Sequence, residues 1–152
     1  LMPTNLYGPG DNFNLENSHV IPALIRKLYE ARINKNSVVS LWGSGQPLRE
    51  FLHVQDLARA IHYFSIQSYK HNIYNIGYGK DITIEELSRI IMEVVGYEGD
   101  IIWDTTKPDG TPKKLLDCSR MEETGFRVKY DLKNGLKDTF NWFVDNYSDI
   151  RQ

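Results

Sequence analysis

Residues 83–96 read Thr-Ile-Glu-Glu-Leu-Ser-Arg-Ile-Ile-Met-Glu-Val-Val-Gly and carry the clearest structural signal in the chain. Thr83 followed by Glu86 forms the capping box that begins a helix, and Gly96 is suited to end one. Between them, apolar residues recur at the helical spacing: Ile84, Leu87, Ile90, Ile91, Val94 and Val95. Apolar side chains at that spacing line one face of a helix, so this segment predicts a helix packed against a core.

The rest of the chain alternates between helical and extended patterns. Helical spacing of apolar residues recurs in three further segments, 18–33, 54–69 and 132–147. Short β-rich runs lie between the helices, at 37–42, 72–77, 100–103 and 114–117. Such alternation predicts an α/β fold, or an α+β arrangement for this chain on its own.

The composition is that of a soluble globular protein. Of the 152 residues, 41% are hydrophobic and 25% are charged, and the net charge is −2, which argues against disorder and against general affinity for nucleic acid. No apolar run approaches the roughly 20 residues of a membrane span, and nothing resembles a signal peptide. The single cysteine, Cys118, excludes an internal disulfide framework, and no side chains show metal-ligand spacing. We therefore expect a cytoplasmic protein without a metal or a membrane partner.

The pattern of the first residues predicts that this chain is part of a larger protein whose N-terminal part is missing here. Pro-Thr-Asn-Leu-Tyr-Gly-Pro (3–9) is typical of a strand end that runs into a loop, and such a strand needs neighbours to pair its backbone. The chain has no G-x-G-x-x-G or P-loop motif, and none of its nine tyrosines is followed by lysine four positions later. We expect the missing part to leave apolar surface uncovered around residues 1–10 and 50–78.

Two loops carry side chains suited to binding an anion. In Trp-Gly-Ser-Gly-Gln-Pro-Leu-Arg-Glu-Phe (42–51), the glycines predict a tight turn, Trp42 offers a flat face and Arg49 a planar fork for phosphate. The alternative is a hairpin with an exposed arginine. In 107–117, two consecutive lysines follow a Pro-Asp-Gly turn, so one can point into a cleft while the other, on the opposite side, stays in water. A solvated turn is the alternative there.

His19 precedes the first helical segment and is a candidate acid or base near neutral pH, although most isolated histidines have no such role. We assign no chemistry to the other histidines, His53, His62 and His71. Cys118 has no nucleophile signature, and we interpret it as a small, part-buried thiol.

Six segments together match one family in order and spacing. They are Pro-Thr-Asn-Leu-Tyr-Gly-Pro (3–9), Asp-Asn-Phe (11–13), Ser-His-Val-Ile-Pro-Ala-Leu (18–24), Trp-Gly-Ser-Gly (42–45), Arg-Glu-Phe-Leu-His-Val (49–54) and Lys-Pro-Asp-Gly-Thr-Pro-Lys-Lys-Leu-Leu-Asp (107–117). With these segments, which span nearly the whole chain, the sequence resembles the GDP-L-fucose synthases, a group of extended short-chain dehydrogenases/reductases.

The resemblance implies a multifunctional enzyme, both isomerase and oxidoreductase. It would convert GDP-4-keto-6-deoxy-D-mannose to GDP-L-fucose by 3,5-epimerisation and NADPH-dependent reduction at C4, as a homodimer. Residues 1–20 would be the end of the NADP-binding Rossmann domain with its loop. Residues 21–152 would be the substrate-binding C-terminal domain, with 50–78 packing back on the nucleotide domain.

The resemblance also assigns roles to individual residues. His19 matches the family's epimerisation acid and lies near the cofactor. The residues matched to NADP binding are Pro3, Thr4, Asn5, Leu6 and His19. The residues matched to the GDP-sugar are Lys27, Trp42, Arg49, Asp109 and Lys114. The cysteine base, the Ser/Tyr/Lys reduction set and the glycine-rich cofactor turn have no match here, and Cys118 is not that base. We therefore expect the isolated chain to lack reductase activity.

Two alternatives stay open. One is another nucleotide-sugar epimerase or dehydratase of the same superfamily, although the segment at 18–22 argues against it. The other is a non-catalytic module that only binds a nucleotide sugar. The main hypothesis depends on one arrangement, in which the cations at 27, 49 and 114 converge on the diphosphate while His19 faces the sugar.

Overall fold

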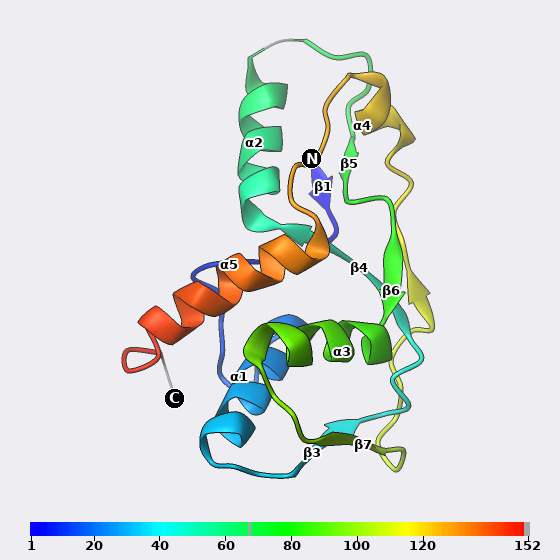
Figure 1. Cartoon of the computed structure of the whole chain (residues 1–152). Coiled ribbons are helices and arrows are strands. Elements are labelled where there is room, and N and C mark those ends of the chain that lie inside the picture. The colour runs from blue at the N-terminus through cyan, green and yellow to red at the C-terminus, as the bar shows by residue number, and fades with distance from the viewer. Residues whose placement is uncertain (67, 151–152) are drawn as a thin grey trace.

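The computed structural model describes residues 1–66 and 68–150. Within them, the helices are α1 (Val20–Ile33), α2 (Val54–Ser65), α3 (Ile84–Val95), α4 (Ser119–Glu123) and α5 (Leu132–Asp145). The strands are β1 (Met2–Pro3), β2 (Asn5–Tyr7), β3 (Val38–Trp42), β4 (Leu48–His53), β5 (Asn75–Ile76), β6 (Asp81–Thr83), β7 (Asp100–Asp104) and β8 (Lys113–Lys114). Helices and strands alternate along the chain, and the α/β class is confirmed (Figure 1).

The four predicted helices are present, and the ends of α3 are those that its sequence predicted. Thr83 Oγ1 accepts a hydrogen bond from Glu86 N at 3.0 Å, and Thr83 N donates to Glu86 Oε2 at 3.2 Å. Gly96 ends the helix in the left-handed conformation, at φ 72°. The helix α2 is shorter than predicted, and Tyr69 instead packs against Phe64 with ring centroids 4.6 Å apart.

Several short elements had no prediction. The strands β4 and β6 and the helix α4 were missed, and β8 covers only Lys113–Lys114 rather than 114–117. The three strands are held by partners far away in the sequence. The strand β4 also interrupts its apolar residues with a charged pair, so it lacks the regular alternation that marks a half-buried strand.

The strand β4 is the element on which the others converge. Its second half pairs in parallel with β2, from Asn5 opposite Phe51 to Tyr7 opposite His53. Its first half lies between β6, which is antiparallel to it, and β8, which is parallel. Two further parallel pairs, β3 with β7 and β1 with β5, complete the sheets of the described chain.

Two apolar cores lie on the two sides of β4. The larger joins α1, α3 and α5 through fully buried side chains such as Ile25, Leu87 and Phe143. The smaller joins α2, α4 and β5, which lie at one end of the molecule (Figure 1), through Leu52, Ala60, Tyr74, Ile76, Cys118, Met121 and Phe126. Phe51 belongs to the larger core and Leu52 to the smaller, because successive strand residues point to opposite faces.

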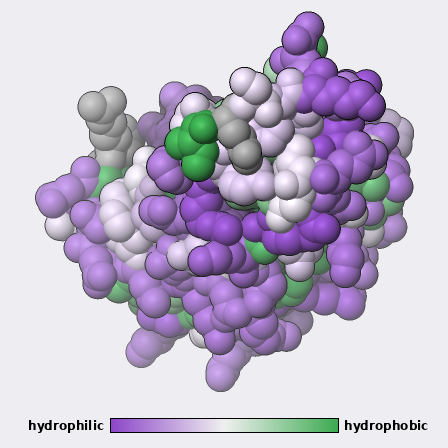
Figure 2. Space-filling view, turned by 90° about the horizontal axis from the view of Figure 1, so that it is seen from above, coloured by the Kyte–Doolittle hydropathy of each residue, from purple (hydrophilic) through white to green (hydrophobic). Residues whose placement is uncertain are grey.

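Large apolar side chains stay exposed near α2 and the first residues, as predicted: Leu1, Met2, Ile61, Ile66 and Ile73. Figure 2 looks onto the end that carries α2 and α4, where hydrophilic residues predominate and hydrophobic ones form small separate patches. The uncovered apolar surface is therefore scattered on this face. None of the described helices is long and apolar enough to cross a membrane.

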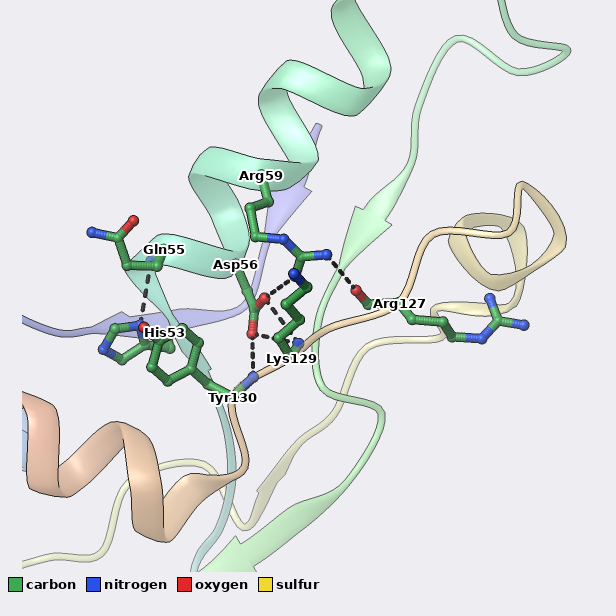
Figure 3. Close-up of polar contacts among 7 residues, drawn as sticks. All are labelled: His53, Gln55, Asp56, Arg59, Arg127, Lys129 and Tyr130. Carbon is green, nitrogen blue, oxygen red and sulfur yellow. Dashed lines mark hydrogen bonds and ion pairs between the residues drawn. The ribbon is translucent and has the colours of Figure 1, made fainter.

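Asp56 is fully buried in the first turn of α2, and it binds the backbone of residues 129–130, just before α5 (Figure 3). Its carboxylate accepts hydrogen bonds from Lys129 N at 2.9 Å and Tyr130 N at 2.9 Å, and it forms an ion pair with Arg59 at 2.5 Å. The ring of Tyr130 stacks on His53 with centroids 4.0 Å apart. A buried carboxylate thus joins two segments more than 70 residues apart in the sequence.

Candidate functional site

A cavity of about 350 Å³ opens between β2, the start of α1, the 42–51 segment and the 108–110 loop. Its wall contains six of the side chains that the sequence assigned to a site: Asn5, Leu6, His19, Trp42, Arg49 and Asp109. Apolar neighbours such as Ile21, Phe51 and Ile84 form the rest of the wall. A hollow that combines apolar side chains with a few polar groups is typical of a small-molecule site.

His19 is the N-cap residue of α1, yet its side chain makes no capping hydrogen bond. The imidazole is exposed on the cavity wall. Burial raises the pKa of the nearby Asp11 carboxyl, while a hydrogen bond from Asn12 N and the charge of His19 act in the opposite direction. The helix start therefore leaves the imidazole available to a molecule in the cavity.

The residues matched to the cofactor divide into two groups. Asn5 and Leu6 line the cavity, and Asn5 Nδ2 donates to Glu50 O at 2.8 Å. Thr4 Oγ1 donates to the same carbonyl at 3.3 Å. Pro3 lies outside the cavity, in β1, and lines a different hollow beside α2.

Arg49 and Lys114 are register partners on the neighbouring parallel strands β4 and β8, so their side chains lie on one face of the sheet. Arg49 lines the cavity, and Nη1 of its guanidinium donates to Leu48 O at 2.8 Å. Lys114 is exposed beside it and does not line the cavity itself. Lys113, on the opposite face, lies 3.2 Å from Asp81 Oδ2. The two lysines therefore diverge, and within residues 1–66 and 68–150 neither Arg49 nor Lys114 forms an ion pair.

Trp42, at the end of β3, is 70% exposed at the edge of the cavity. The ammonium groups of Lys27 and Lys107 lie 5.6 Å and 5.8 Å from its ring centroid. Both contacts are within the range of a cation–π interaction. The structure thus directs Lys27 toward the indole rather than into the cavity, and it brings Arg49 and Lys114 together without Lys27.

Asp109 connects the 108–110 loop to the glycine turn at residues 43–45, which follows β3. Its carboxylate accepts hydrogen bonds from Ser44 N at 2.9 Å and from Ser44 Oγ at 2.6 Å. These bonds, the hydroxyl bond first, hold the pKa of the Asp109 carboxyl below its usual range. Gly43 has φ 81°, and a Cβ there would overlap the Asp109 carboxylate. The loop and the turn therefore form one wall of the cavity.

Two residues that the sequence did not single out also shape this site. Ser44 fixes Asp109, and Glu50 is fully buried behind Arg49. No local signal marked Glu50, because its burial and its partners Gly79 N and Leu116 N come from segments far away in the sequence. Cys118 is buried, more completely than the part-buried thiol that the sequence predicted, and burial, followed by the charge of Glu50, raises its pKa to about 12, so its thiol is protonated at neutral pH.

Known proteins are similar to this chain in both sequence and fold. The model of the NAD dependent epimerase/dehydratase family matches residues 1–77. The chain is 51% identical to the probable GDP-L-fucose synthase 1 of Oryza sativa subsp. japonica, over 95% of this chain and 44% of that protein. It is 46% identical to the GDP-L-fucose synthase of Escherichia coli (strain K12), over 99% of this chain and 50% of that protein.

A solved structure agrees with these relatives. The GDP-L-fucose synthetase from Naegleria fowleri bound to NADP superposes with a TM-score of 0.92 at 31% identity, over 100% of this chain and 46% of that one. The chain thus spans about half the length of the relatives that it matches. Because the family model covers just over half of its residues and the fold agrees throughout, the chain belongs to the NAD dependent epimerase/dehydratase family.

Proposed function

We propose that this chain is the GDP-sugar-binding part of a GDP-L-fucose synthase. The intact enzyme would convert GDP-4-keto-6-deoxy-D-mannose to GDP-L-fucose by 3,5-epimerisation and NADPH-dependent reduction at C4. The observation that carries the proposal is the cavity, which gathers His19, Trp42 and Arg49 from three separate segments. The similarity to curated GDP-L-fucose synthases over nearly the whole chain supports it.

The diphosphate would bind to Arg49 and Lys114. A guanidinium donates two parallel hydrogen bonds to a phosphate, and an ammonium adds a point charge. The two side chains share one face of neighbouring strands and have no carboxylate partner among the described residues. The exposed indole of Trp42 would lie against the base, with Lys27 holding the indole and Asp109 shaping the wall through Ser44.

His19 would supply a proton to the sugar during epimerisation. A proton beside a ketone is removed as an enolate forms, and inversion requires that a second group return a proton to the opposite face. An imidazole suits this step because its ordinary pKa lies close to neutral pH. The exposed imidazole lies on the cavity wall and makes no capping hydrogen bond to α1, which supports this assignment.

Asn5, Leu6 and His19 would lie on the nicotinamide side of NADP, with Thr4 and Pro3 preceding them. The residues fit this group, because Asn5 and Leu6 line the same cavity as His19. Bound NADPH would supply the hydride for C4. The hydrogen bond from Asn5 Nδ2 to Glu50 O, at 2.8 Å, would hold Asn5 in place beside the cofactor.

We also propose the domain arrangement of the family. Residues 1–20 would end the Rossmann domain and 21–152 would form the substrate domain, with 50–78 packing back on the first. The separate smaller core around α2 and β5, and the exposed Ile61, Ile66 and Ile73, support that return. The working enzyme would be a cytoplasmic homodimer, and the reduced Cys118 fits such a compartment.

Isothermal calorimetry with GDP and guanosine tests the proposal. A folded chain should bind GDP and should bind guanosine at least tenfold more weakly, because guanosine lacks the diphosphate. A folded chain that binds neither compound at millimolar concentration refutes the nucleotide site. Product analysis with the intact protein then separates GDP-L-fucose formation from a simple 4-epimerisation or from binding without turnover.

A further inference from the structure

Glu50 is a buried carboxylate between two residues that line the cavity. Its side chain is 0% exposed, while Arg49 and Phe51 on either side contribute to the cavity wall. Because strand residues alternate, Glu50 points away from the cavity and into the layer behind it. A buried carboxylate is costly unless hydrogen bonds satisfy it, so its partners indicate its role.

Both carboxylate oxygens of Glu50 hold the backbone of distant segments. Oε1 accepts a hydrogen bond from Gly79 N at 2.7 Å, and Oε2 accepts one from Leu116 N at 3.0 Å. A Cβ at Gly77 would overlap Oε1, so the chain passes close to the carboxylate there as well. Within the described residues Glu50 has no basic partner, and backbone amides alone satisfy it.

The Leu116 bond stabilises the position of β8. This strand consists of Lys113 and Lys114 alone, and among the described strands it pairs only with β4. A two-residue strand has few ladder bonds, so its register depends on what holds it on either side. Leu48 N donates to Pro112 O at 2.8 Å before the strand, and Leu116 N donates to Glu50 after it. These two bonds keep Lys114 opposite Arg49.

We propose that Glu50 is a positioning residue for the diphosphate site. Its carboxylate fixes the 113–116 segment against β4, and this fixes the separation between the ammonium of Lys114 and the guanidinium of Arg49. The inference rests on the proposed function, because it assumes that these two cations bind a diphosphate. Glu50 itself touches no substrate.

A double-mutant cycle with GDP as the probe tests this role. In Glu50→Gln the amide keeps the size of the side chain but places an NH₂ group against one of the two backbone N–H donors. Lys114→Ala should weaken GDP binding about tenfold, as expected for a lost charged hydrogen bond. Glu50→Gln should weaken it by a similar factor, and the double variant should lose about tenfold rather than a hundredfold, because both changes remove one interaction.

Asp56→Asn is the matched control. Asp56 is equally buried and also holds backbone N–H groups, but these belong to Lys129 and Tyr130, in a segment that carries neither Arg49 nor Lys114. Both variants should melt at a lower temperature, and only Glu50→Gln should raise the Kd of GDP. Measurements are made well below the melting temperature of each variant. If Glu50→Gln does not fold, Glu50→Asp replaces it, since this residue keeps the charge but is too short to reach both donors.

The outcomes separate the two proposals. If the wild-type chain binds no GDP, the proposed function fails first. If it binds GDP and Glu50→Gln binds equally well, the positioning role is wrong. The role is also wrong if the losses in the double variant multiply, or if Asp56→Asn weakens GDP binding as much as Glu50→Gln does.

Discussion

Replacing Arg49 by alanine should weaken GDP binding by about 1.5–3 kcal/mol, the usual loss for hydrogen bonds to a charged group. A guanidinium carries five N–H donors, and Nη1 of Arg49 already donates to Leu48 O. Arg49 lines the cavity, and within the described residues no carboxylate forms an ion pair with it. Because the side chain is only half-buried, we expect the lower part of this range, a loss of about tenfold to thirtyfold in Kd. Calorimetry with GDP measures it directly.

Two companion variants make this prediction sharp. Arg49→Lys keeps the charge but loses the planar fork, so it should recover part of the affinity, and its remaining binding should be weaker at high salt. Arg89→Ala removes an exposed arginine that pairs with Glu85 at 2.6 Å and lies outside the cavity. This control should bind GDP like the wild type. An unchanged Kd in folded Arg49→Ala, or an equal loss in Arg89→Ala, would refute the assignment of Arg49 to the diphosphate.

Burial lowers the pKa of His53 below its ordinary 6.5, against the opposing charges of Asp138 and Asp56. Below about pH 6.5 His53 therefore binds a proton more readily in the unfolded chain than in the folded chain. Lower pH then favours the unfolded state, so the free energy of unfolding, measured in urea, should fall from pH 7 to pH 5. His53→Gln should flatten this dependence, and an unchanged slope would contradict it. Gly43→Ala should raise the Kd of GDP, because the added Cβ displaces the Asp109 carboxylate. Calorimetry with GDP measures this change, and Gly10→Ala is the control, because a Cβ at Gly10 meets no atom within 4 Å. The isolated chain should not oxidise NADPH in the presence of GDP-4-keto-6-deoxy-D-mannose, and a decrease of absorbance at 340 nm above the blank would overturn that expectation.

Local signals in the sequence were sufficient for the helices α1, α2, α3 and α5, whereas the five-residue α4 was missed. The capping box at Thr83 and Glu86 involves residues three positions apart, and the apolar spacing of α3 repeats within one segment. The two-residue strand β8 has no such signal. Its backbone bonds go to β4, more than 60 residues away in the sequence, and no window of neighbouring residues contains that information. The short strand β6 was missed for the same reason.

The candidate site divides in the same way. The residue types made His19 and Arg49 candidates only, and the family resemblance placed them in one site. The direction of Lys27 was not accessible from the sequence, because a lysine one or two turns into α1 reaches either the cavity or the indole of Trp42, depending on its rotamer. Glu50 was missed because its role depends on the amides of Gly79 and Leu116, which only the fold brings to it.

The alternation along β4 explains why one strand serves both binding and stability. Arg49 and Phe51 face the cavity, while Glu50 and Leu52 face the layer formed by the 77–79 and 116–118 segments and the smaller core. A shift of the strand by one residue would exchange these two sets. It would place the carboxylate of Glu50 where the proposed diphosphate would require a cation, and it would bury the guanidinium of Arg49 against the backbone N–H donors of Gly79 and Leu116. Donors facing donors cannot form hydrogen bonds, so the amides that satisfy Glu50 also prevent this shift. The same two hydrogen bonds therefore fix the register of β4 and the sign of the charge that the cavity presents.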